Sequence, residues 1–228
     1  MHIPDGFLDL KTWGTLYGVS GGTTAYALYK VRDRLDEVKI PFLGIVAAFI
    51  FAAQMLNFPI AGGTSGHYVG ALLACVLLGP WEGFLVMVVV LLVQGLFFAD
   101  GGMTALGANI FNMGIIAGLL SYYLLALNKG LLSRLMGEKK ALLVSVAFYS
   151  WLAVVLASSA CAVELAISGT MPLGTALPAM AGVHAVIGIG EAIIGVVVCA
   201  VVLQARPDLV DAYHFKPEML GTVTGEVA

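Results

Sequence analysis

Long apolar stretches that are almost free of charge constrain this chain more than any other feature. Of its 228 residues, 60% are hydrophobic and only 11% are charged, whereas a soluble domain carries about 25% charged residues. The mean hydropathy is +0.98. Such a composition predicts a polytopic helical membrane protein. The net charge of −3 gives no indication of nucleic-acid binding, and we expect no nucleic-acid partner.

Seven apolar segments are candidates for membrane-spanning helices. They cover residues 13–29, 40–57, 65–79, 81–99, 104–127, 141–168 and 179–204. A span needs about 20 apolar residues, so the first and third segments are the weakest candidates. Gly79-Pro80 separates the third segment from the fourth, because this dipeptide breaks helices. We therefore expect an all-α fold, a bundle of seven transmembrane helices in a single membrane domain, residues 1–228.

The basic residues predict how this bundle lies in the membrane. They gather in three clusters: Lys30, Arg32, Arg34 and Lys39; Lys129, Arg134, Lys139 and Lys140; Arg206 and Lys216. Positive loops stay cytoplasmic, and an even number of spans between neighbouring clusters keeps all three on that side. The N-terminus is then outside and the C-terminus inside. We expect residues 1–12 to be an extracytoplasmic segment, 13–205 the transmembrane bundle and 206–228 a cytoplasmic tail.

The opening residues, MHIPDG, offer metal donors. They lack the regions of a signal peptide, so we expect the mature chain to begin at Met1. Its α-amine, the backbone amide nitrogen of His2 and an imidazole nitrogen of His2 can close two chelate rings around one ion. The amide must lose its proton, which favours planar nitrogen sites for Ni²⁺ or Cu²⁺, with Co²⁺ as a further candidate. Mg²⁺ and Ca²⁺ prefer oxygen, and Zn²⁺ prefers a tetrahedron. The alternative is that His2 belongs to a frayed chain end.

A second histidine could complete a planar site. His67 follows the glycine-rich stretch NFPIAGGTSGH on the expected outer side, one turn into the third segment. That segment is too short to cross the membrane as a helix, so its loop should dip inward, within reach of the N-terminus. Pro4-Asp5-Gly6 is a turn signal that would fold Met1 and His2 back over the bundle. These features together favour a metal site.

Polar residues beside His67 could support such a site. Asn57, Thr64 and Ser65 could hydrogen-bond the loop and fix the His67 ring. The alternative for Thr64 or Ser65 is that it only caps the third helix.

Three ionisable residues fall inside the apolar segments: Glu164, His184 and Glu191. Ionisable side chains within a membrane are costly, and they are usually functional or paired. They could orient the metal ligands from behind. The alternative is a structural Glu–His pair between the sixth and seventh helices.

The motifs MHIPDGFL, GGTSGH and HAVIGIGEA make the chain resemble the NikM/CbiM family from residue 1 to about 205. These proteins are substrate-binding membrane components (S components) of energy-coupling-factor importers for nickel and cobalt in prokaryotic cell membranes. The resemblance implies a six-helix core with an added N-terminal helix, and it implies that Met1, His2 and His67 hold the ion. Pro4-Asp5 is closer to the nickel type. The implied partners are a membrane coupling subunit, cytoplasmic ATPase subunits and a small accessory membrane protein, within membrane lipid.

A stripe of small residues in the second segment could receive a partner. Gly44, Ala48 and Ala52 recur every four residues in PFLGIVAAFIFAAQML, and such a helix face allows close approach of another helix in lipid. S components resemble one another in docking through a stripe of this kind. The alternative is packing within this protein.

Three function classes compete. The leading one is capture of Ni²⁺, or of Co²⁺, for an ATP-driven importer; no G-x-x-x-x-G-K-[ST] phosphate loop occurs, so other chains would supply the ATPase. The second is a proton-coupled secondary transporter of divalent transition metals, with Glu164 and Glu191 as proton carriers. An enzyme is the least favoured, because no serine–histidine or H-E-x-x-H arrangement lies on any segment.

Overall fold

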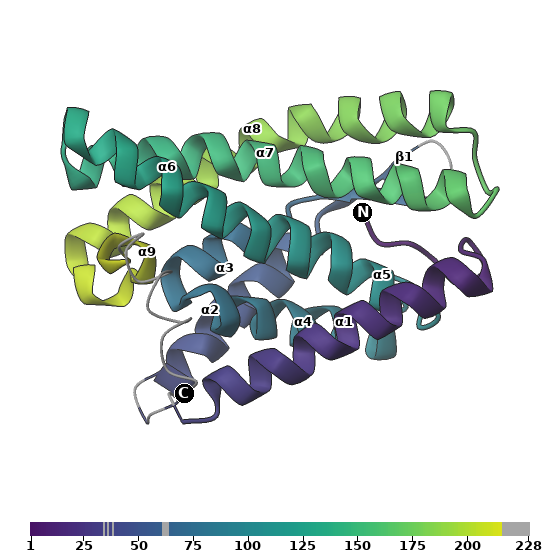
Figure 1. Cartoon of the computed structure of the whole chain (residues 1–228), viewed down its shortest axis with the longest axis horizontal. Helices are drawn as coiled ribbons and strands as arrows, with labels where there is room; N and C mark the ends of the chain where they lie inside the picture. The colour runs from purple at the N-terminus through teal and green to yellow at the C-terminus, as the bar shows by residue number, and fades with distance from the viewer. Residues whose placement is uncertain (34, 36, 38, 61–63, 216–228) are drawn as a thin grey trace, which may run out of the picture.

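The computed structural model describes residues 1–33, 35, 37, 39–60 and 64–215. Within them the chain is a bundle of helices with one short β-hairpin (Figure 1). The helices are α1 (Leu10–Val31), α2 (Lys39–Gln54), α3 (Ala71–Leu78), α4 (Pro80–Phe97), α5 (Leu106–Ile110), α6 (Ser121–Met136), α7 (Glu138–Ile167), α8 (Leu173–Ala205) and α9 (Asp211–His214). Strands β1 (Asn57–Ile60) and β2 (Thr64–His67) form the hairpin, η1 (Phe111–Leu120) is π-helical and η2 (Pro207–Leu209) is a 3₁₀ turn.

Four helical stretches in the described part of the chain are long and apolar enough to cross a membrane: Pro80–Phe97, Leu106–Met136, Glu138–Ile167 and Leu173–Ala205. The second of them joins α5, η1 and α6. Helix α2 is apolar but has only 16 residues. Helix α1 has 22 residues, and its Gly, Ser and Thr content lowers its apolar character. The expected number of seven spans, and the direction of the termini, stay predictions.

The third apolar segment differs from the expectation. Residues 64–67 form strand β2, and α3 begins only at Ala71. His67 therefore ends a strand; the expectation that it lies one turn into a helix is wrong. The remaining helix has 8 residues, of which seven are fully buried. A helix of this length is too short to cross the membrane. The hairpin before it extends the segment, because its two strands satisfy each other's backbone hydrogen bonds in the bundle interior.

The expected break at Gly79-Pro80 is confirmed. Helix α3 ends just before Gly79, which has φ 99, and Pro80 is the first residue of α4. Glycine accepts a positive φ without steric cost, and proline suits the first helical position because that N–H has no helical partner. The two helices then pack backbone to backbone: a Cβ added to Gly83 would lie 2.5 Å from the amide nitrogen of Cys75.

Helix α3 lies at the centre of the bundle. It contacts α2, α4, η1, α6, α7, α8 and α9. Helices α7 and α8 pair extensively with each other, and α1 packs on α4 and α5. Figure 1 marks the start of the chain inside the outline of the bundle, and Met1 is fully buried.

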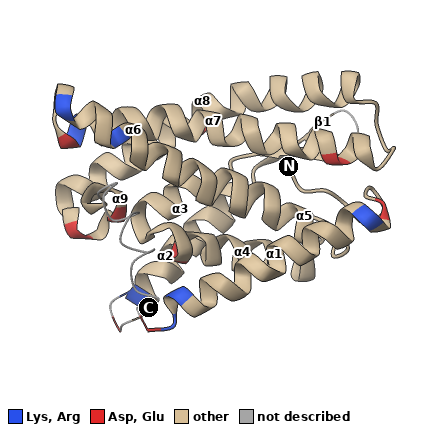
Figure 2. Ribbon diagram, in the orientation of Figure 1, with Lys and Arg blue, Asp and Glu red and all other residues tan. Residues whose placement is uncertain are grey.

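Lys and Arg are unevenly distributed along the long axis of the molecule (Figure 2). Figure 2 shows most Lys and Arg at the end where α1 leads into α2 and α6 into α7, which we call the basic end. The other end, the N-terminal end, carries residues 1–9. Hydrogen bonds join this segment to the α4–α5 loop, from Thr104 to Asp5, and to the α7–α8 loop, from Thr170 to Phe7. The first two basic clusters thus share one end; Arg34 and Lys216 lie outside the described residues.

Candidate metal centre

The first residues fold back into the bundle. Met1 and Ile3 are fully buried, and His2 is 4% exposed. The Met1 amine donates to the carbonyl oxygen of Ser65 on β2 and lies 3.3 Å from its hydroxyl. Asn109 on α5 accepts from the Ile3 N–H at 2.8 Å and donates to the Ile3 carbonyl at 3.3 Å. The backbone N–H and C=O of Ile3 are therefore both held by one side chain.

Two glycines in the α4–α5 loop make room for this segment. A Cβ on Gly102 would overlap the amide nitrogen of Asp5, and a Cβ on Gly101, where φ is 96, would lie 3.3 Å from Cδ2 of His2. Thr104 donates its N–H and its hydroxyl to the Asp5 carboxylate at 2.7 and 2.6 Å. The loop is thus shaped around the N-terminal segment.

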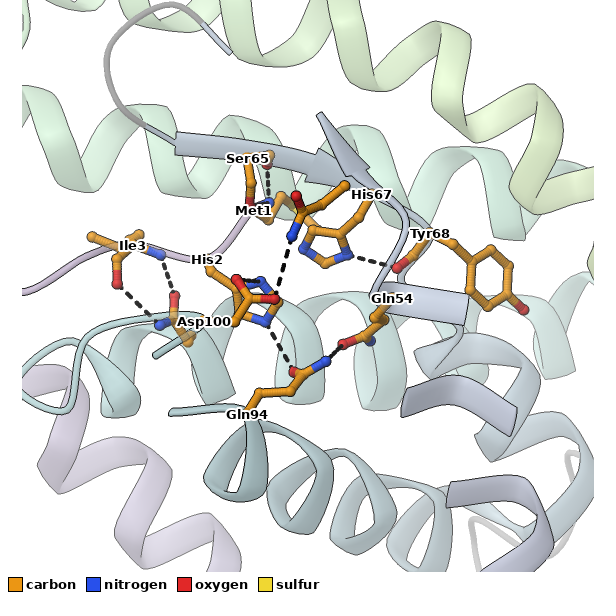
Figure 3. A network of polar contacts seen from close by, with 11 residues as sticks. Met1, His2, Ile3, Gln54, Ser65, His67, Tyr68, Gln94 and Asp100 are labelled. Atoms are coloured by element: carbon orange, nitrogen blue, oxygen red, sulfur yellow. Dashed lines mark hydrogen bonds and ion pairs between the residues drawn. The ribbon is translucent and has the colours of Figure 1, made fainter. Parts of the chain in front are cut away.

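The rings of His2 and His67 stack, with centroids 4.5 Å apart and planes inclined by 18° (Figure 3). His67 Nδ1 donates to the Tyr68 carbonyl at 2.6 Å, and His67 Nε2 has no hydrogen-bond partner among the described residues. His2 Nε2 donates to Gln94 Oε1 at 3.1 Å, and His2 Nδ1 likewise lacks a partner there. A buried nitrogen without a partner is rare, so each ring offers one free lone pair.

A relay of two glutamines holds the His2 ring from behind (Figure 3). Gln94 Nε2 donates to Gln54 Oε1 at 3.0 Å, and Gln54 Nε2 donates to the Val69 carbonyl at 2.6 Å. Both glutamines are fully buried. The relay has a direction, because a carbonyl can only accept. Each amide must present its oxygen to the next donor, so His2 carries its proton on Nε2 and keeps Nδ1 free.

Glu191 on α8 holds the end of that relay. Its two carboxylate oxygens accept from the backbone N–H of Val69 at 2.8 Å and of Gly70 at 2.6 Å. We call residues 68–70 the anchor segment. Its first carbonyl orients His67 and its second carbonyl ends the relay to His2. Both imidazoles are therefore oriented through three consecutive residues, and Glu191 ties these residues to α8.

Glu164 and His184 do not form the structural pair considered from the sequence. Glu164 accepts from Asn112 Nδ2 at 2.7 Å, and His184 Nδ1 donates to the Met180 carbonyl at 2.7 Å. His184 Nε2 is buried without a partner among the described residues. His184 and Glu191 share the buried face of α8, as their spacing of seven residues predicts.

The three hairpin candidates have separate contacts. Asn57 lies opposite His67 across the hairpin. The Thr64 hydroxyl donates to a methionine sulfur on α8 at 3.0 Å, and Ser65 accepts from the amino group at the start of the chain. Neither Thr64 nor Ser65 caps α3, because its N-cap is Gly70 at φ 73. The hairpin thus connects the N-terminal segment with α8.

Burial keeps the nitrogen donors neutral. It lowers the pKa of the Met1 amino group from 8.0 to about 5. It also lowers the pKa of His2. Burial alone would raise the pKa of Asp100, but its contacts with His2 and Asn57 hold it below the usual range. At neutral pH the site presents free nitrogen lone pairs beside a carboxylate.

This donor set suits a planar nitrogen complex. The amine of Met1, the amide nitrogen and Nδ1 of His2, and Nε2 of His67 supply four nitrogens, which is the set that Ni²⁺ and Cu²⁺ favour. Each lone pair lies in the plane of its own ring, so the parallel stack must open before both rings can bind one ion. Among the described residues, no three side chains of His, Cys, Asp or Glu cluster as a conventional metal site.

Sequence reasoning missed Gln54, Gln94, Asn109 and Asp100. The signal for Gln54 and Gln94 was present, since both are uncharged polar residues within apolar helices, where an unpaired amide is costly. Asn109 and Asp100 carry no local signal, because their partners lie near the start of the chain.

Comparison with known proteins places these features in context. A family model described as the cobalt uptake substrate-specific transmembrane region, CbiM, matches residues 2–209. A relative in Archaeoglobus fulgidus carries the name of a fused nickel transport protein, NikMN; it is 42% identical over 213 residues, which are 92% of this chain and 68% of the relative. The fused nickel transport protein NikMN of Rhodobacter capsulatus is 33% identical over 224 residues, 92% of this chain and 63% of that protein. A crystal structure of a transition metal transporter superimposes with a TM-score of 0.80 at 32% identity. The match covers 99% of this chain and 100% of the transporter chain.

Proposed function

The chain belongs to the CbiM family of nickel and cobalt transport proteins, and from this premise we propose that it captures Ni²⁺ as the substrate-binding subunit of an ATP-driven energy-coupling-factor importer. Co²⁺ is the second candidate substrate. One observation carries the proposal: the buried amino group of Met1 lies in one cluster with two stacked imidazoles, and each ring keeps one nitrogen without a partner among the described residues.

Four nitrogens hold the ion in this proposal. Met1 contributes its amine, His2 its deprotonated amide and Nδ1, and His67 contributes Nε2. The glutamine relay and the anchor segment fix which nitrogen of each ring carries the proton, so that the lone pairs of His2 Nδ1 and His67 Nε2 stay free for the ion. The carbonyl oxygen of Ser65 accepts a hydrogen bond from the amine and holds it in place before the ion arrives.

The basic end lies in the cytoplasm in this proposal, because Lys and Arg stay on that side of the membrane. The N-terminal end and the metal site are then at the outer face. The bundle crosses the membrane seven times, with α1, α2 and the hairpin with α3 added to the four long stretches. The chain from residue 206 onward forms the cytoplasmic tail.

The small-residue stripe of α2 receives the membrane coupling subunit. Gly44, Ala48 and Ala52 are all exposed, and a Cβ on Gly44 would meet nothing within 4 Å. The stripe therefore faces away from the bundle, which supports docking over internal packing. Cytoplasmic ATPase subunits drive the cycle through the coupling subunit, and a small accessory membrane protein completes the importer.

A proton-coupled transporter has less support. Such a carrier needs carboxylates that can change their charge during transport. Both oxygens of Glu191 accept backbone N–H groups, and Glu164 accepts from Asn112. Uptake that stops with a protonophore, but continues when ATP is depleted, would favour that carrier over the importer.

Metal content after purification tests the site, measured by elemental analysis on three proteins. The first is the native chain, the second carries His67→Ala, and the third has Gly-Ser-Gly added before Met1. The addition moves the amine away from the site. One added residue would be a poor control, because histidine at the third position forms its own planar chelate.

We expect about one Ni²⁺ per native chain and a loss of metal in both variants. If the extended protein still holds its metal, the amine is not a ligand. Thermal melting of the two ion-free variants, compared with the ion-free native chain, separates loss of a ligand from loss of the fold.

A further inference from the structure

A cavity of about 450 Å³ lies beside His2 at the N-terminal end. The hairpin, the N-terminal segment and the α4–α5 loop form its walls. We call this cavity the vestibule; its polar lining residues are His2, Asp5, Asn57, Thr64, Ser65 and Asp100. The ligand cluster itself is buried, so the vestibule is the place where a cation from solvent first meets protein groups.

Asp100 connects the vestibule with the His2 ring (Figure 3). Its Oδ1 lies 3.1 Å from His2 Nδ1. Because the glutamine relay places the ring proton on Nε2, Nδ1 has no proton to donate to this carboxylate and keeps its lone pair. The Asp100 side chain is 15% exposed, whereas that of His2 is 3% exposed. The carboxylate thus touches both the solvent side and the buried nitrogen.

The backbone holds Asp100 in this place. Its N–H donates to the Gln94 carbonyl at 3.1 Å, and Asn57 Nδ2 lies 3.5 Å from Oδ2. Ala99 before it has φ 52 and Gly101 after it has φ 96. A positive φ is unfavourable for alanine, so the turn that presents this carboxylate is locally strained.

A second carboxylate lines the same cavity. Asp5 is fixed by its two hydrogen bonds from Thr104, and these bonds hold its pKa below the usual range. Two carboxylates held in place in one cavity raise the local concentration of cations and speed their arrival.

We propose that the vestibule is a first, oxygen-lined binding site for the hydrated divalent cation, and that Asp100 passes the ion to Nδ1 of His2. The proposal rests on the capture function above. A hydrated transition-metal ion is surrounded by water oxygens, and a carboxylate is the charged, reachable ligand that can replace the first of them. The released water leaves through the vestibule. The ion then exchanges oxygen for nitrogen over the 3.1 Å between Oδ1 and Nδ1.

The same carboxylate balances charge after the transfer. A divalent ion bound by one deprotonated amide and three neutral nitrogens keeps one positive charge. A buried charge is costly without a partner, and Asp100 lies beside the ring that holds it. Asp100 therefore acts on the arrival of the ion and on its retention, without being one of the four nitrogen ligands.

The test mixes purified, metal-free protein with a Ni²⁺ salt in a stopped-flow instrument. The absorption band of the planar nitrogen complex reports both the association rate and the final geometry. The variants are Asp100→Asn, which removes the charge at nearly constant size, and Asp100→Glu, which keeps it. Asp9→Asn is the matched control, because Asp9 lies at the same end, does not line the vestibule, and asparagine still caps α1.

We expect the association rate to fall about tenfold in Asp100→Asn at low salt, with the planar band retained. Asp100→Glu should stay within a few-fold of the native rate, and so should Asp9→Asn. Added salt should narrow the gap between the native chain and Asp100→Asn.

Two results would overturn the inference. One is an unchanged association rate in Asp100→Asn. The other is loss of the planar band in both Asp100 variants, which would make Asp100 a purely structural residue. If the native chain shows no band at all, the capture function fails, and that failure is distinct from either result.

Discussion

At the residue scale, different contacts fix the tautomers of the two candidate ligand histidines. A backbone carbonyl takes the Nδ1 proton of His67, and a glutamine takes the Nε2 proton of His2. The free nitrogens therefore differ, Nε2 on one ring and Nδ1 on the other. In the proposed complex, Nδ1 of His2 would close a six-membered chelate ring with the amide nitrogen of the same residue. Nε2 of His67 would reach the ion from β2.

The number of protons released when Ni²⁺ binds reports whether the nitrogen donors are already neutral. The amine has a folded-state pKa of about 5, so it is already neutral at pH 7, and burial also lowers the pKa of His2. We expect Ni²⁺ binding at pH 7 to release about one proton, from the His2 amide. Calorimetry in two buffers of different ionisation enthalpy gives this number. As pH falls toward 5, the amine takes up a proton that the metal must displace, so release should rise and affinity should fall.

A short unstructured peptide with the same first residues is the control for that measurement. Its exposed amine keeps a pKa near 8, so it should release about two protons at pH 7. Two protons from the protein would show that its amine is charged before the ion binds.

Local sequence identified the ligand candidates but not their orientation. Met1 and His2 are adjacent, and His67 follows a distinctive loop, so each could be found from its neighbours. The contacts that orient them join His2 to Gln94, Gln94 to Gln54 and Val69 to Glu191. Those partners are far apart in the chain, and no local pattern specifies such pairs.

At the element scale, the anchor segment is the joint between the metal site and α8. Residues 68–70 orient both rings, and Glu191 is the attachment of this segment to the helix. A displacement of α8 would therefore disturb both imidazoles together, and in the proposed importer this would couple the movement of α8 to the bound ion.

Glu191→Gln tests this joint. One of two backbone N–H groups would face an amide donor in place of an acceptor, at a cost of about 2 kcal/mol. For a chain of this size we expect the melting temperature to fall by roughly 4–8 °C and Ni²⁺ affinity to fall about 10- to 100-fold. Thermal melting and a Ni²⁺ titration measure the two effects.

Cys199→Ala is the matched control. Cys199 is fully buried on the same face of α8, so its truncation should lower the melting temperature without changing Ni²⁺ affinity. Equal losses of affinity in both variants would mean that stability alone, and not the anchor segment, governs binding.

Most helices were predictable from apolar runs and breaker residues, but the hairpin was not. The segment 65–79 is mostly apolar but begins SGHYVG, and a short stretch of this kind fits the start of a helix or a buried strand equally well. What decides for a strand is the pairing of Thr64–His67 with Asn57–Ile60. That pairing is a property of two segments together.

At the scale of the whole molecule, the metal site and the small-residue stripe lie on separate surfaces. Gly44, Ala48 and Ala52 face outward along α2, while the ligands lie inside the bundle. Capture and docking should therefore be separable by mutation. The sequence predicts that the first two basic clusters share one end of the molecule. This could be predicted because the tendency of Lys and Arg to stay on one side of the membrane does not depend on how the helices pack.

Ala48→Leu should separate the two functions. A leucine on the stripe would hold a partner helix away, so we expect Ni²⁺ uptake by the assembled importer to fall at least about tenfold, while the purified subunit keeps its Ni²⁺. Radioactive nickel uptake by cells and metal content of the purified protein measure these effects. Ala25→Leu, at an exposed alanine on α1, is the control and should leave both unchanged. Equal uptake by the two variants would place the docking surface elsewhere.

The burial of residues 1–3 sets an order of events during biosynthesis. These residues are made before the elements that surround them, which are β2, the α4–α5 loop and α5, and the anchor segment that completes their place is tied to α8. A ribosome must therefore deliver the chain as far as α8 before residues 1–3 can settle. Until then these residues lack their contacts, so a nascent chain halted before α8 should expose them to an aminopeptidase that the finished protein resists.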